Sequence, residues 1–245
     1  MQFEQVSIII GATDEDETLR KTVDSIMENC DVKDIAKVII VISANASEGC
    51  RNAIDYLKNK YGDVICSMVQ KRRYVGGAIR DGFDVAESSH LMLLPADMAI
   101  GLDCVPEMIK RVKQKPDVIS KTSRWIKADA FHGYNNAKKA VNSMAQVFLR
   151  LLFRENITDF TNSVQTFPSY VHKNCNWQEE GFPYLLEMVL LPLRMGMKFE
   201  EFPAECFSRE EGESKNSAGQ TAMYLKTALR IRFTRKNKLF RVTKE

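Results

Sequence analysis

Short apolar runs recur through the first half of this chain, and the clearest of them lack the apolar–polar alternation of a half-exposed strand. They lie at residues 5–10, 37–43, 63–69, 91–94 and 117–120. Continuous runs of this kind indicate strands that are covered on both faces of a sheet. Helical patterns separate them, and strand–helix alternation with short links predicts a parallel sheet with right-handed crossovers. We therefore predict an α/β fold, a Rossmann-like sheet flanked by helices.

Caps and stop signals mark the helices between these runs. Residues 13–19 supply cap residues and first-turn acids for one helix. Ser47 is placed to cap a second helix that Gly62 ends. Residues 76–86 predict a third helix, which begins at a glycine pair.

The second half contains two longer helical patterns. The first follows a loop that begins near residue 122, and we expect its apolar stripe to pack on the sheet. That stripe comprises Val141, Met144, Ala145, Phe148, Leu149 and Leu152. Residues 177–196 predict a helix that is kinked near Pro192 and ended by Gly196. Residues 197–209 predict a short strand pair or a strand-bulge-strand.

Asp97 occupies the most informative position in the sequence. It follows the apolar run 91–94 after Pro95 and Ala96, and a helix start at Asp103 comes soon afterwards. In an open α/β sheet, ligands gather where the carboxyl ends of strands meet the following loops. A carboxylate there is a candidate for holding a divalent metal against phosphate oxygens. A turn or helix-capping role for Asp97 is the alternative.

Composition limits the class of protein. At 245 residues the chain has room for one large α/β domain or two small ones. No apolar run approaches the roughly 18 residues needed to cross a bilayer, and no signal-peptide pattern precedes the first strand. The six cysteines have no CxxC spacing and the three histidines lie far apart. These features argue against structural zinc and favour a reduced, cytoplasmic setting.

The charge is distributed unevenly. Residues 226–245 contain eight Lys or Arg and one acid, a local charge of +7 in a chain whose net charge is +3. Leu225, Leu229 and Phe233 recur there at helical spacing. A basic amphipathic segment suits an anionic membrane surface. We expect no nucleic-acid partner, since no RNA- or DNA-binding motif is present.

The order of motifs resembles the family-2 glycosyltransferases of the GT-A fold, and most closely the dolichyl- or polyprenyl-phosphate mannose and glucose synthases. Residues 6–19, 38–49, 74–83 and 91–99 carry the resemblance. The first loop of that family reads Pro-x-Tyr-Asn-Glu, the second Asp-Asp-Gly-Ser and the third Asp-Ala-Asp. Here the first loop reads Gly-Ala-Thr-Asp-Glu, the second Ser-Ala-Asn-Ala and the third Pro-Ala-Asp. One of two expected metal ligands and the base-reading acids are therefore replaced.

The resemblance implies a donor site and a metal. Asp97 would hold Mg²⁺ or Mn²⁺ on the diphosphate of a UDP-, GDP- or CDP-sugar, because Mg²⁺ needs only one or two carboxylates besides substrate phosphates and water. The donor site would be lined by nine positions: Gly11, Ala12, Thr13, Glu15, Ser43, Asn45, Gly76, Arg80 and Ala96. The GxGxxG and Walker patterns are absent, so dinucleotide and P-loop sites are weaker interpretations.

The resemblance also covers an acceptor side. Arg124 and Lys138 match or lie near basic positions of the family, and Gln165 replaces a cation of its Gly-Phe-Arg. The most specific match is Arg-x-x-Gly-x-Ser-Lys at residues 209–215. Arg209 and Lys215 would neutralise phosphate charge as catalytic residues with Asp97. The acceptor would be bound by Arg124, Lys138, Gln165 and Ser214.

The resemblance implies an inverting sugar transfer to a polyprenyl (dolichyl-type) phosphate, and with the basic C-terminal segment we expect a peripheral enzyme at the inner membrane face. An anionic acceptor needs positioning and charge neutralisation more than a base. One alternative acceptor is a glycan or polyol hydroxyl, with Glu179 or Glu180 as base. Another alternative is an inactive nucleotide-binding relative. A nucleotidyltransferase is less favoured.

The resemblance also suggests how the chain is divided. We predict a GT-A domain over residues 1–220, with a nucleotide-sugar half at 1–122 and an acceptor half at 123–220. Residues 221–245 would form a basic amphipathic tail that meets the membrane. A homo-oligomer or a membrane protein partner stays open.

Overall fold

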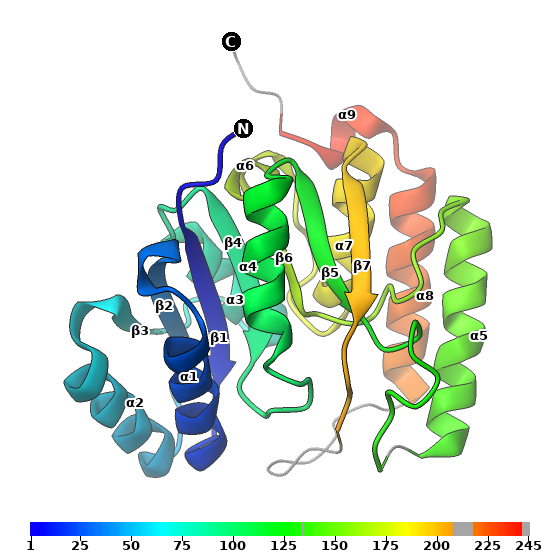
Figure 1. The fold of residues 1–245 in the computed structure, drawn as a ribbon. Coiled ribbons are helices and arrows are strands. Elements are labelled where there is room, and N and C mark those ends of the chain that lie inside the picture. Colours follow the sequence, from blue (N-terminus) through cyan, green and yellow to red (C-terminus); the bar gives the residue numbers. More distant parts are fainter. Residues whose placement is uncertain (134, 208–217, 242–245) are drawn as a thin grey trace.

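The chain folds around one mixed sheet. The computed structural model describes residues 1–133, 135–207 and 218–241, and at residues 138 and 218–220 it describes the backbone but not the side chains. The sheet order is β3-β2-β1-β4-β6-β5-β7 (Figure 1). The strands are β1 (Val6–Ala12), β2 (Ile35–Ile42), β3 (Ile65–Val69), β4 (His90–Pro95), β5 (Val118–Ser123), β6 (Gln165–Pro168) and β7 (Lys198–Pro203). The predicted α/β fold is confirmed.

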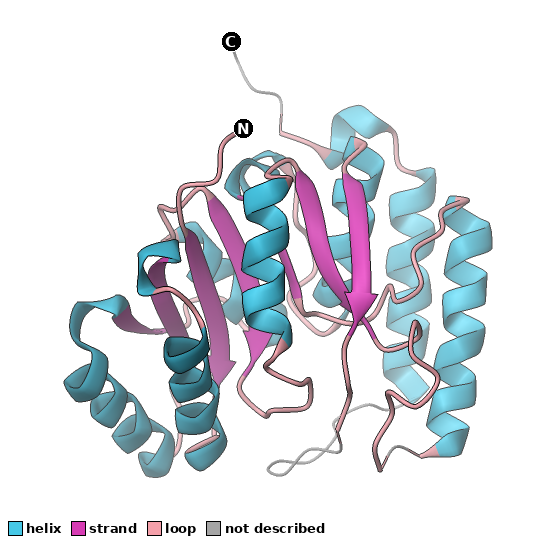
Figure 2. Ribbon diagram, in the orientation of Figure 1, coloured by secondary structure: helices cyan, strands magenta, loops and turns pink. Residues whose placement is uncertain are grey.

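Helices cover both faces of this sheet, as Figure 2 shows. One face carries α1 (Glu17–Asn29), α2 (Glu48–Tyr61) and α4 (Cys104–Gln114), and the other carries α3 (Tyr74–Asp84) and α7 (Pro183–Met195). Ile8 and Ile10 of β1 enter the first core, whereas Ile9 enters the second, because successive side chains of a strand point to opposite faces. All three are fully buried, which explains the continuous apolar runs.

Local signals placed several element ends correctly. The Ser47 side chain accepts a hydrogen bond from the Cys50 amide, and Gly62 ends α2 with φ of 64°. Gly196 ends α7 with φ of 99°, a left-handed conformation that glycine adopts without a steric penalty. The fourth helix starts directly after Asp103, as predicted.

Strand β6, which is antiparallel to both β4 and β5, was not predicted from the sequence. It is only four residues long, and it begins with Gln165 and Thr166. Short polar runs carry no clear strand signal. All four residues are nevertheless buried, because the strand fills the gap between two parallel neighbours.

Helix α5 (Asn136–Phe153) lies differently from our prediction. Leu149 is buried, but Val141, Met144 and Phe148 of the expected inward stripe are exposed. The helix is apolar around much of its circumference, so periodicity could not select its inner face. It lies beside α8 (Ala218–Phe233) at the end of the molecule (Figure 1).

The C-terminal segment belongs to the same body. Helix α8 packs on α7 and buries Thr227, Ala228 and Ile231, so the predicted boundary at residues 220/221 falls inside a helix. The remaining described elements are the short helices α6 (Ser169–Asn174) and α9 (Lys236–Leu239). Two short 3-10 helices, η1 (Val32–Asp34) and η2 (Gly62–Val64), are also present. None of the described helices is both long and apolar enough to span a bilayer.

Residues 197–209, predicted as a short strand pair or a strand-bulge-strand, contain the single strand β7 as far as the described range extends, to residue 207. Strand β7 pairs with β5 in parallel, and Cys206 after it makes isolated bridges to Ile100 and Phe131. Pro203 ends the strand, and Cys206 then crosses the loops that follow β4 and β5. The residues around Cys206 therefore lie at the edge of the sheet that carries Asp97.

Close packing of α3 on the sheet gives a first prediction. A Cβ atom on Gly82 would lie 2.8 Å from Ile9 Cγ2 and 2.9 Å from Val41 Cγ2, both on rigid strands. We expect Gly82→Ala to lower the free energy of unfolding by about 1–3 kcal/mol, because an extra methyl group in a packed core forces its neighbours to move. Urea titrations measure this change. Gly181→Ala is the control, since its Cβ would meet no atom closer than 3.6 Å. Equal stability of both variants would contradict the packing described.

Candidate functional site

The carboxyl ends of β1, β2 and β4 meet at one edge of the sheet. These strands are parallel neighbours, with β1 in the middle, and Gly11 pairs with Val41 on one side and Pro95 on the other. Ligands of open α/β sheets bind at this kind of edge. The loops that follow the three strands therefore form the candidate site.

Asp97 is buried at the turn after β4. Its Oδ1 accepts a hydrogen bond from the Ala99 amide at 3.1 Å, and Met98 between them has a φ of 51°. A left-handed methionine is uncommon, and such strain is concentrated at functional sites. The turn fixes the carboxylate at the edge of the sheet, where we expected a metal ligand. Ala96 beside it is also buried.

The loop after β1 is organised by Glu15. Its Oε2 accepts hydrogen bonds from the amides of Thr13 (2.7 Å) and Asp14 (3.1 Å). The Thr13 carbonyl in turn accepts from the Ser47 amide at 2.9 Å. Glu15 thus shapes the loop and joins it to the start of α2. Gly11 and Ala12 are the last two residues of β1 itself.

The loop after β2 lies beside it. The Ser43 hydroxyl accepts from the Asn45 amide at 3.2 Å, and the Ser43 carbonyl accepts from the Ala46 amide. Arg51 supports this turn by donating to the Ala44 carbonyl at 2.9 Å. Asn45 is exposed at its tip, so its amide is presented to solvent at the site edge.

Gly76 has a packing role that differs from the donor contact we expected. A Cβ there would lie 2.5 Å from Tyr184 Cβ and 2.8 Å from the Glu180 carbonyl. The neighbouring Gly77 amide donates to that same carbonyl at 3.0 Å. The glycine pair therefore lets the start of α3 contact the loop before α7. Arg80 is half-buried one turn along α3.

Arg124 is engaged in a buried ion pair. Its Nε and Nη2 donate to the two carboxylate oxygens of Asp159 at 2.7 and 2.8 Å, and Nη2 also reaches Thr161. Burial would raise the pKa of Asp159, but the charge and hydrogen bonds of Arg124 outweigh it and lower the pKa from 3.8 to about 2. Arg124 therefore fixes the loop after α5 at the end of β5.

Gln165 lies in the core, not at an acceptor surface as we expected. Its side chain is buried and its Nε2 donates to the Met188 carbonyl on α7 at 3.1 Å. The antiparallel strand β6 places it within the sheet, in contact with α7. The side chain of Lys138 and the whole of Arg209, Ser214 and Lys215 lie outside the described residues.

A buried polar network was missed by the sequence analysis. Lys121 of β5 is fully buried, donates to the Asn162 carbonyl, and has its pKa lowered by burial from 10.5 to about 8. Glu201 of β7 accepts from the amides of Thr158 and Asp159. These groups hold residues 157–164 against β5 and β7. The only available signal was a lysine directly after the apolar run 117–120.

The glutamates proposed as alternative bases differ in environment. Glu179 accepts from the Thr227 hydroxyl at 2.7 Å and pairs with Arg230 at 3.1 Å. Arg230 also pairs at 2.7 Å with Glu187, a fully buried acid. Arg230, which we predicted as part of the membrane-binding tail, therefore joins α8 to α7 through ion pairs. Glu180 is exposed.

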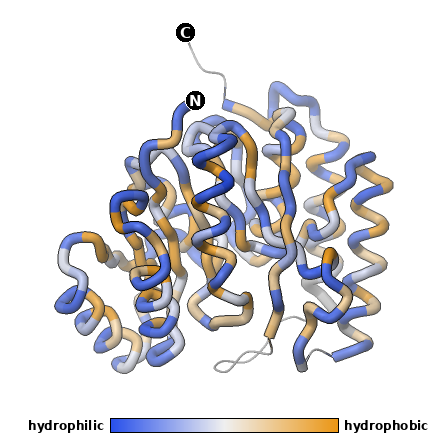
Figure 3. Tube along the Cα trace, in the orientation of Figure 1, coloured by the Kyte–Doolittle hydropathy of each residue, from blue (hydrophilic) through white to orange (hydrophobic). Residues whose placement is uncertain are grey.

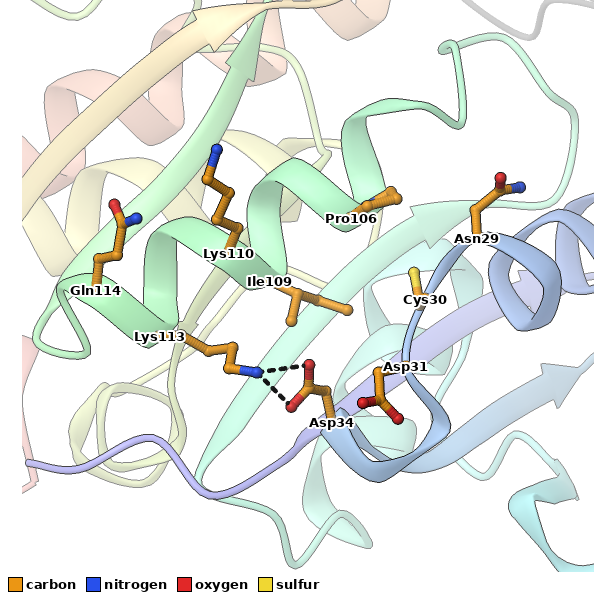
Figure 4. A pocket seen from close by; sticks show the side chains of 9 residues that line it. All are labelled: Asn29, Cys30, Asp31, Asp34, Pro106, Ile109, Lys110, Lys113 and Gln114. Atoms are coloured by element: carbon orange, nitrogen blue, oxygen red, sulfur yellow. Dashed lines mark hydrogen bonds and ion pairs between the residues drawn. The ribbon is translucent and has the colours of Figure 1, made fainter.

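A surface hollow between α1 and α4 lies at the opposite edge of the sheet (Figure 4). Asp34, directly before β2, and Lys113, near the end of α4, form an ion pair of 2.8 Å beside it. Because these residues precede their strands, the hollow is remote from the loops that follow the strands. It contributes nothing to the candidate site. Within the described ranges, no three His, Cys, Asp or Glu side chains gather as a metal-binding cluster.

A mixed α/β sheet with a buried acid after β4, at the edge where β1, β2 and β4 end, fits a nucleotide-sugar enzyme of the GT-A type. The family model for "Glycosyl transferase family 2" matches residues 7–173, about two thirds of the chain. The chain belongs to this family and is a glycosyltransferase. The resemblance that the four motifs indicated is confirmed at the level of family and fold.

Solved structures agree with this fold. A glucosyl-3-phosphoglycerate synthase of Mycobacterium tuberculosis, in complex with Mn²⁺, UDP and phosphoglyceric acid, is similar with a TM-score of 0.69 at 13% identity. The alignment covers 96% of this chain and 80% of that one. A complex of the same synthase with Mn²⁺, UDP-glucose and phosphoglyceric acid gives a TM-score of 0.71 at 10% identity, covering 96% and 81%.

The Arg124–Asp159 pair predicts a pH dependence. Because the folded-state pKa of Asp159 lies below its ordinary value, its contribution is present above about pH 4 and is lost as pH falls toward 2. Asp159→Asn removes the fully buried carboxylate of this ion pair, so we expect a loss of about 3–5 kcal/mol at pH 7 in urea unfolding. The loss should shrink near pH 2.5. Asp129→Asn, at an exposed aspartate, should change little. A loss that stays constant with pH would contradict this ion pair.

Proposed function

We propose that this glycosyltransferase moves a sugar from a nucleoside-diphosphate donor to a polyprenyl phosphate, with inversion, as a peripheral enzyme at the inner face of a membrane. The observation that carries the proposal is the state of the carboxylates around the site. Asp159 is paired with Arg124, Glu179 with Arg230, and Glu15 is bound by two amides. An acceptor that already bears an anionic oxygen needs none of them as a base.

The donor half rests on the three loops at the sheet edge. We assign the nucleoside to the surface formed by Thr13, Ser43 and Asn45, whose hydroxyl and amide groups can donate and accept hydrogen bonds. Thr13 and Asn45 are exposed and Ser43 is half-buried, which suits contact with a ligand. The base-reading acids of the family are absent here, so UDP-, GDP- and CDP-sugars are all candidates.

The metal would be held by Asp97. A buried carboxylate, fixed by the Ala99 amide, suits a hard cation that takes its other ligands from diphosphate oxygens and water. Mg²⁺ and Mn²⁺ are the candidates, and the Mn²⁺ in complexes of the similar synthase supports the second. When bound, such an ion would supply charge neutralisation on the leaving diphosphate.

The protein's own cations would complete the charge balance. The acceptor oxygen attacks the anomeric carbon as the bond to the diphosphate breaks, and negative charge passes to the leaving group. Arg209 and Lys215 are assigned to that phosphate charge, and Ser214 and Lys138 to the acceptor. Arg124 contributes by fixing residues 157–164 through Asp159. The basic C-terminal segment would bring the enzyme to an anionic membrane that contains the lipid acceptor.

A soluble phosphorylated acid is the second candidate acceptor. The similar synthase was solved with phosphoglyceric acid, which also presents anionic oxygens. A neutral glycan or polyol hydroxyl is less favoured, because it needs a base. Glu179 is held by Thr227 and Arg230, which leaves exposed Glu180 as the base for that reaction.

Removing the proposed metal ligand tests the donor site. Donor and Mn²⁺ at about a hundred times the dissociation constant should stabilise the wild-type protein by roughly 2.7 kcal/mol in thermal-shift titrations. We expect Asp97→Asn to lose the Mn²⁺-dependent part of this stabilisation. Asp63→Asn, at an exposed acid near the opposite edge, is the charge-matched control. If Asp97→Asn kept the full metal-dependent shift, the assignment of Asp97 would fail.

A comparison of acceptors tests the reaction. The donor is the UDP-, GDP- or CDP-sugar that stabilises the protein most in the thermal-shift titrations. With it, we expect transfer to polyprenyl phosphate to exceed transfer to polyprenol by about a hundredfold or more, because a general base contributes about 10²–10⁴ to the rate of such a reaction and a neutral hydroxyl needs one. Radiolabelled donor and product separation measure the rates. Faster transfer to phosphoglycerate than to polyprenyl phosphate would select the second candidate. Turnover with a neutral hydroxyl alone would contradict the anionic-acceptor proposal.

A further inference from the structure

The outer face of α5 is strongly apolar although it faces solvent. Val141, Met144, Val147, Phe148 and Leu151 lie on one side of the helix at spacings of three and four residues, and all are exposed. Met144 and Leu151 have exposed fractions of 73% and 74%. A surface helix normally turns such a stripe toward the core. Contiguous exposed apolar side chains of this kind mark interaction surfaces.

Helix α8 continues this surface. It lies beside α5, and Arg232 near its end donates to the Leu152 carbonyl near the end of α5 at 2.8 Å. Leu225, Leu229 and Phe233 are exposed at spacings of four residues, and Phe233 is 75% exposed. Figure 3 shows hydrophobic segments along both helices at this end of the molecule. We call these eight side chains on α5 and α8 the two-helix face.

The two segments that carry the two-helix face have charges of one sign. Residues 136–154 and 218–241 contain no Asp or Glu, whereas they contain four and seven Lys or Arg, respectively. Some of these cations are structural, as the pairing of Arg230 with Glu179 and Glu187 illustrates. Six others are exposed: Arg154, Lys226, Arg235, Lys236, Lys238 and Arg241. Apolar side chains with basic flanks are the composition of helices that lie in a membrane interface.

We propose that the two-helix face docks this enzyme on an anionic bilayer, with the apolar side chains of α5 entering the interface together with those of α8. A second copy of the chain fits the face less well. Symmetric pairing would place α5 and α8 of two copies, helices that contain cations and no acid, against each other, and like charges oppose such contact. Anionic headgroups instead complement the exposed cations while the acyl boundary accepts the apolar side chains.

The topology relates this face to the site. Strand β5 is parallel to β4, because each is antiparallel to β6, and α5 follows β5 after a loop. Helix α5 therefore starts at the same sheet edge as Asp97 and runs away from it (Figure 1). Docking by this face would bring the candidate site next to headgroups. The docking proposal deepens the proposed function and rests on its lipid-phosphate acceptor. It assigns α5, and not the basic C-terminal segment alone, to membrane binding.

Vesicle flotation with the full chain tests the docking. Vesicles of phosphatidylcholine with about 30% phosphatidylglycerol are compared with phosphatidylcholine alone. We expect the wild-type protein to float with the anionic vesicles, and Met144→Glu/Leu151→Glu to reduce its partition coefficient by about tenfold or more. The control is Val32→Glu/Val85→Glu, which adds the same charge at two apolar residues, each 50% exposed, away from α5 and α8. Its binding should change less than twofold.

Three outcomes would overturn the docking proposal. They are absence of wild-type flotation, equal binding of the α5 variant and the control, and a wild-type dimer in sedimentation that Met144→Glu/Leu151→Glu converts to monomer. Sugar transfer to detergent-solubilised polyprenyl phosphate separates the two proposals. If that transfer persists while flotation fails, only the docking is wrong. If flotation succeeds without any transfer, the acceptor assignment fails and the docking surface stands.

Discussion

Burial of β1 on both faces is the constraint on which the rest of the structure depends. Its isoleucines alternate between two cores, and each is fully removed from water. Full burial of one such side chain contributes about 1.5–3 kcal/mol. A strand of this kind must lie between neighbours and beneath helices on each face. That position directs β1, β2 and β4 to end at a common edge, where Asp97 and the two polar loops meet.

The two halves of the sheet are held by different forces. Apolar contacts between strands and helices hold the part of the sheet from β3 to β4. Beyond β4, buried charges and hydrogen bonds contribute much more, from the Arg124–Asp159 pair, Lys121 and Glu201. Buried ions are tolerated only where each is paired and hydrogen-bonded. This network joins residues 157–164 to β5 and β7.

The outer helices connect the fold to the proposed reaction. Arg230 ties α8 to α7 through Glu179 and Glu187, so the C-terminal segment is part of the domain and carries its cations at a fixed place. That tie leaves Leu229 and Phe233 facing outward beside α5. A glycosyltransferase that meets a lipid phosphate needs both an anion-tolerant site and a surface for its membrane. On our proposals, one end of this molecule would provide both.

The sequence by itself determined the α/β class, the strands and helices of the first half, the family and the place of Asp97, because periodicity, caps and motif order are local properties. Only the tertiary structure decided which face of α5 is buried, since that helix is apolar on more than one side. It alone revealed β6, whose four residues are buried by neighbours distant in sequence. It also assigned Gly76 and Gln165 to packing and paired Arg124 with Asp159. Such contacts join residues far apart in the chain, and no local pattern encodes them.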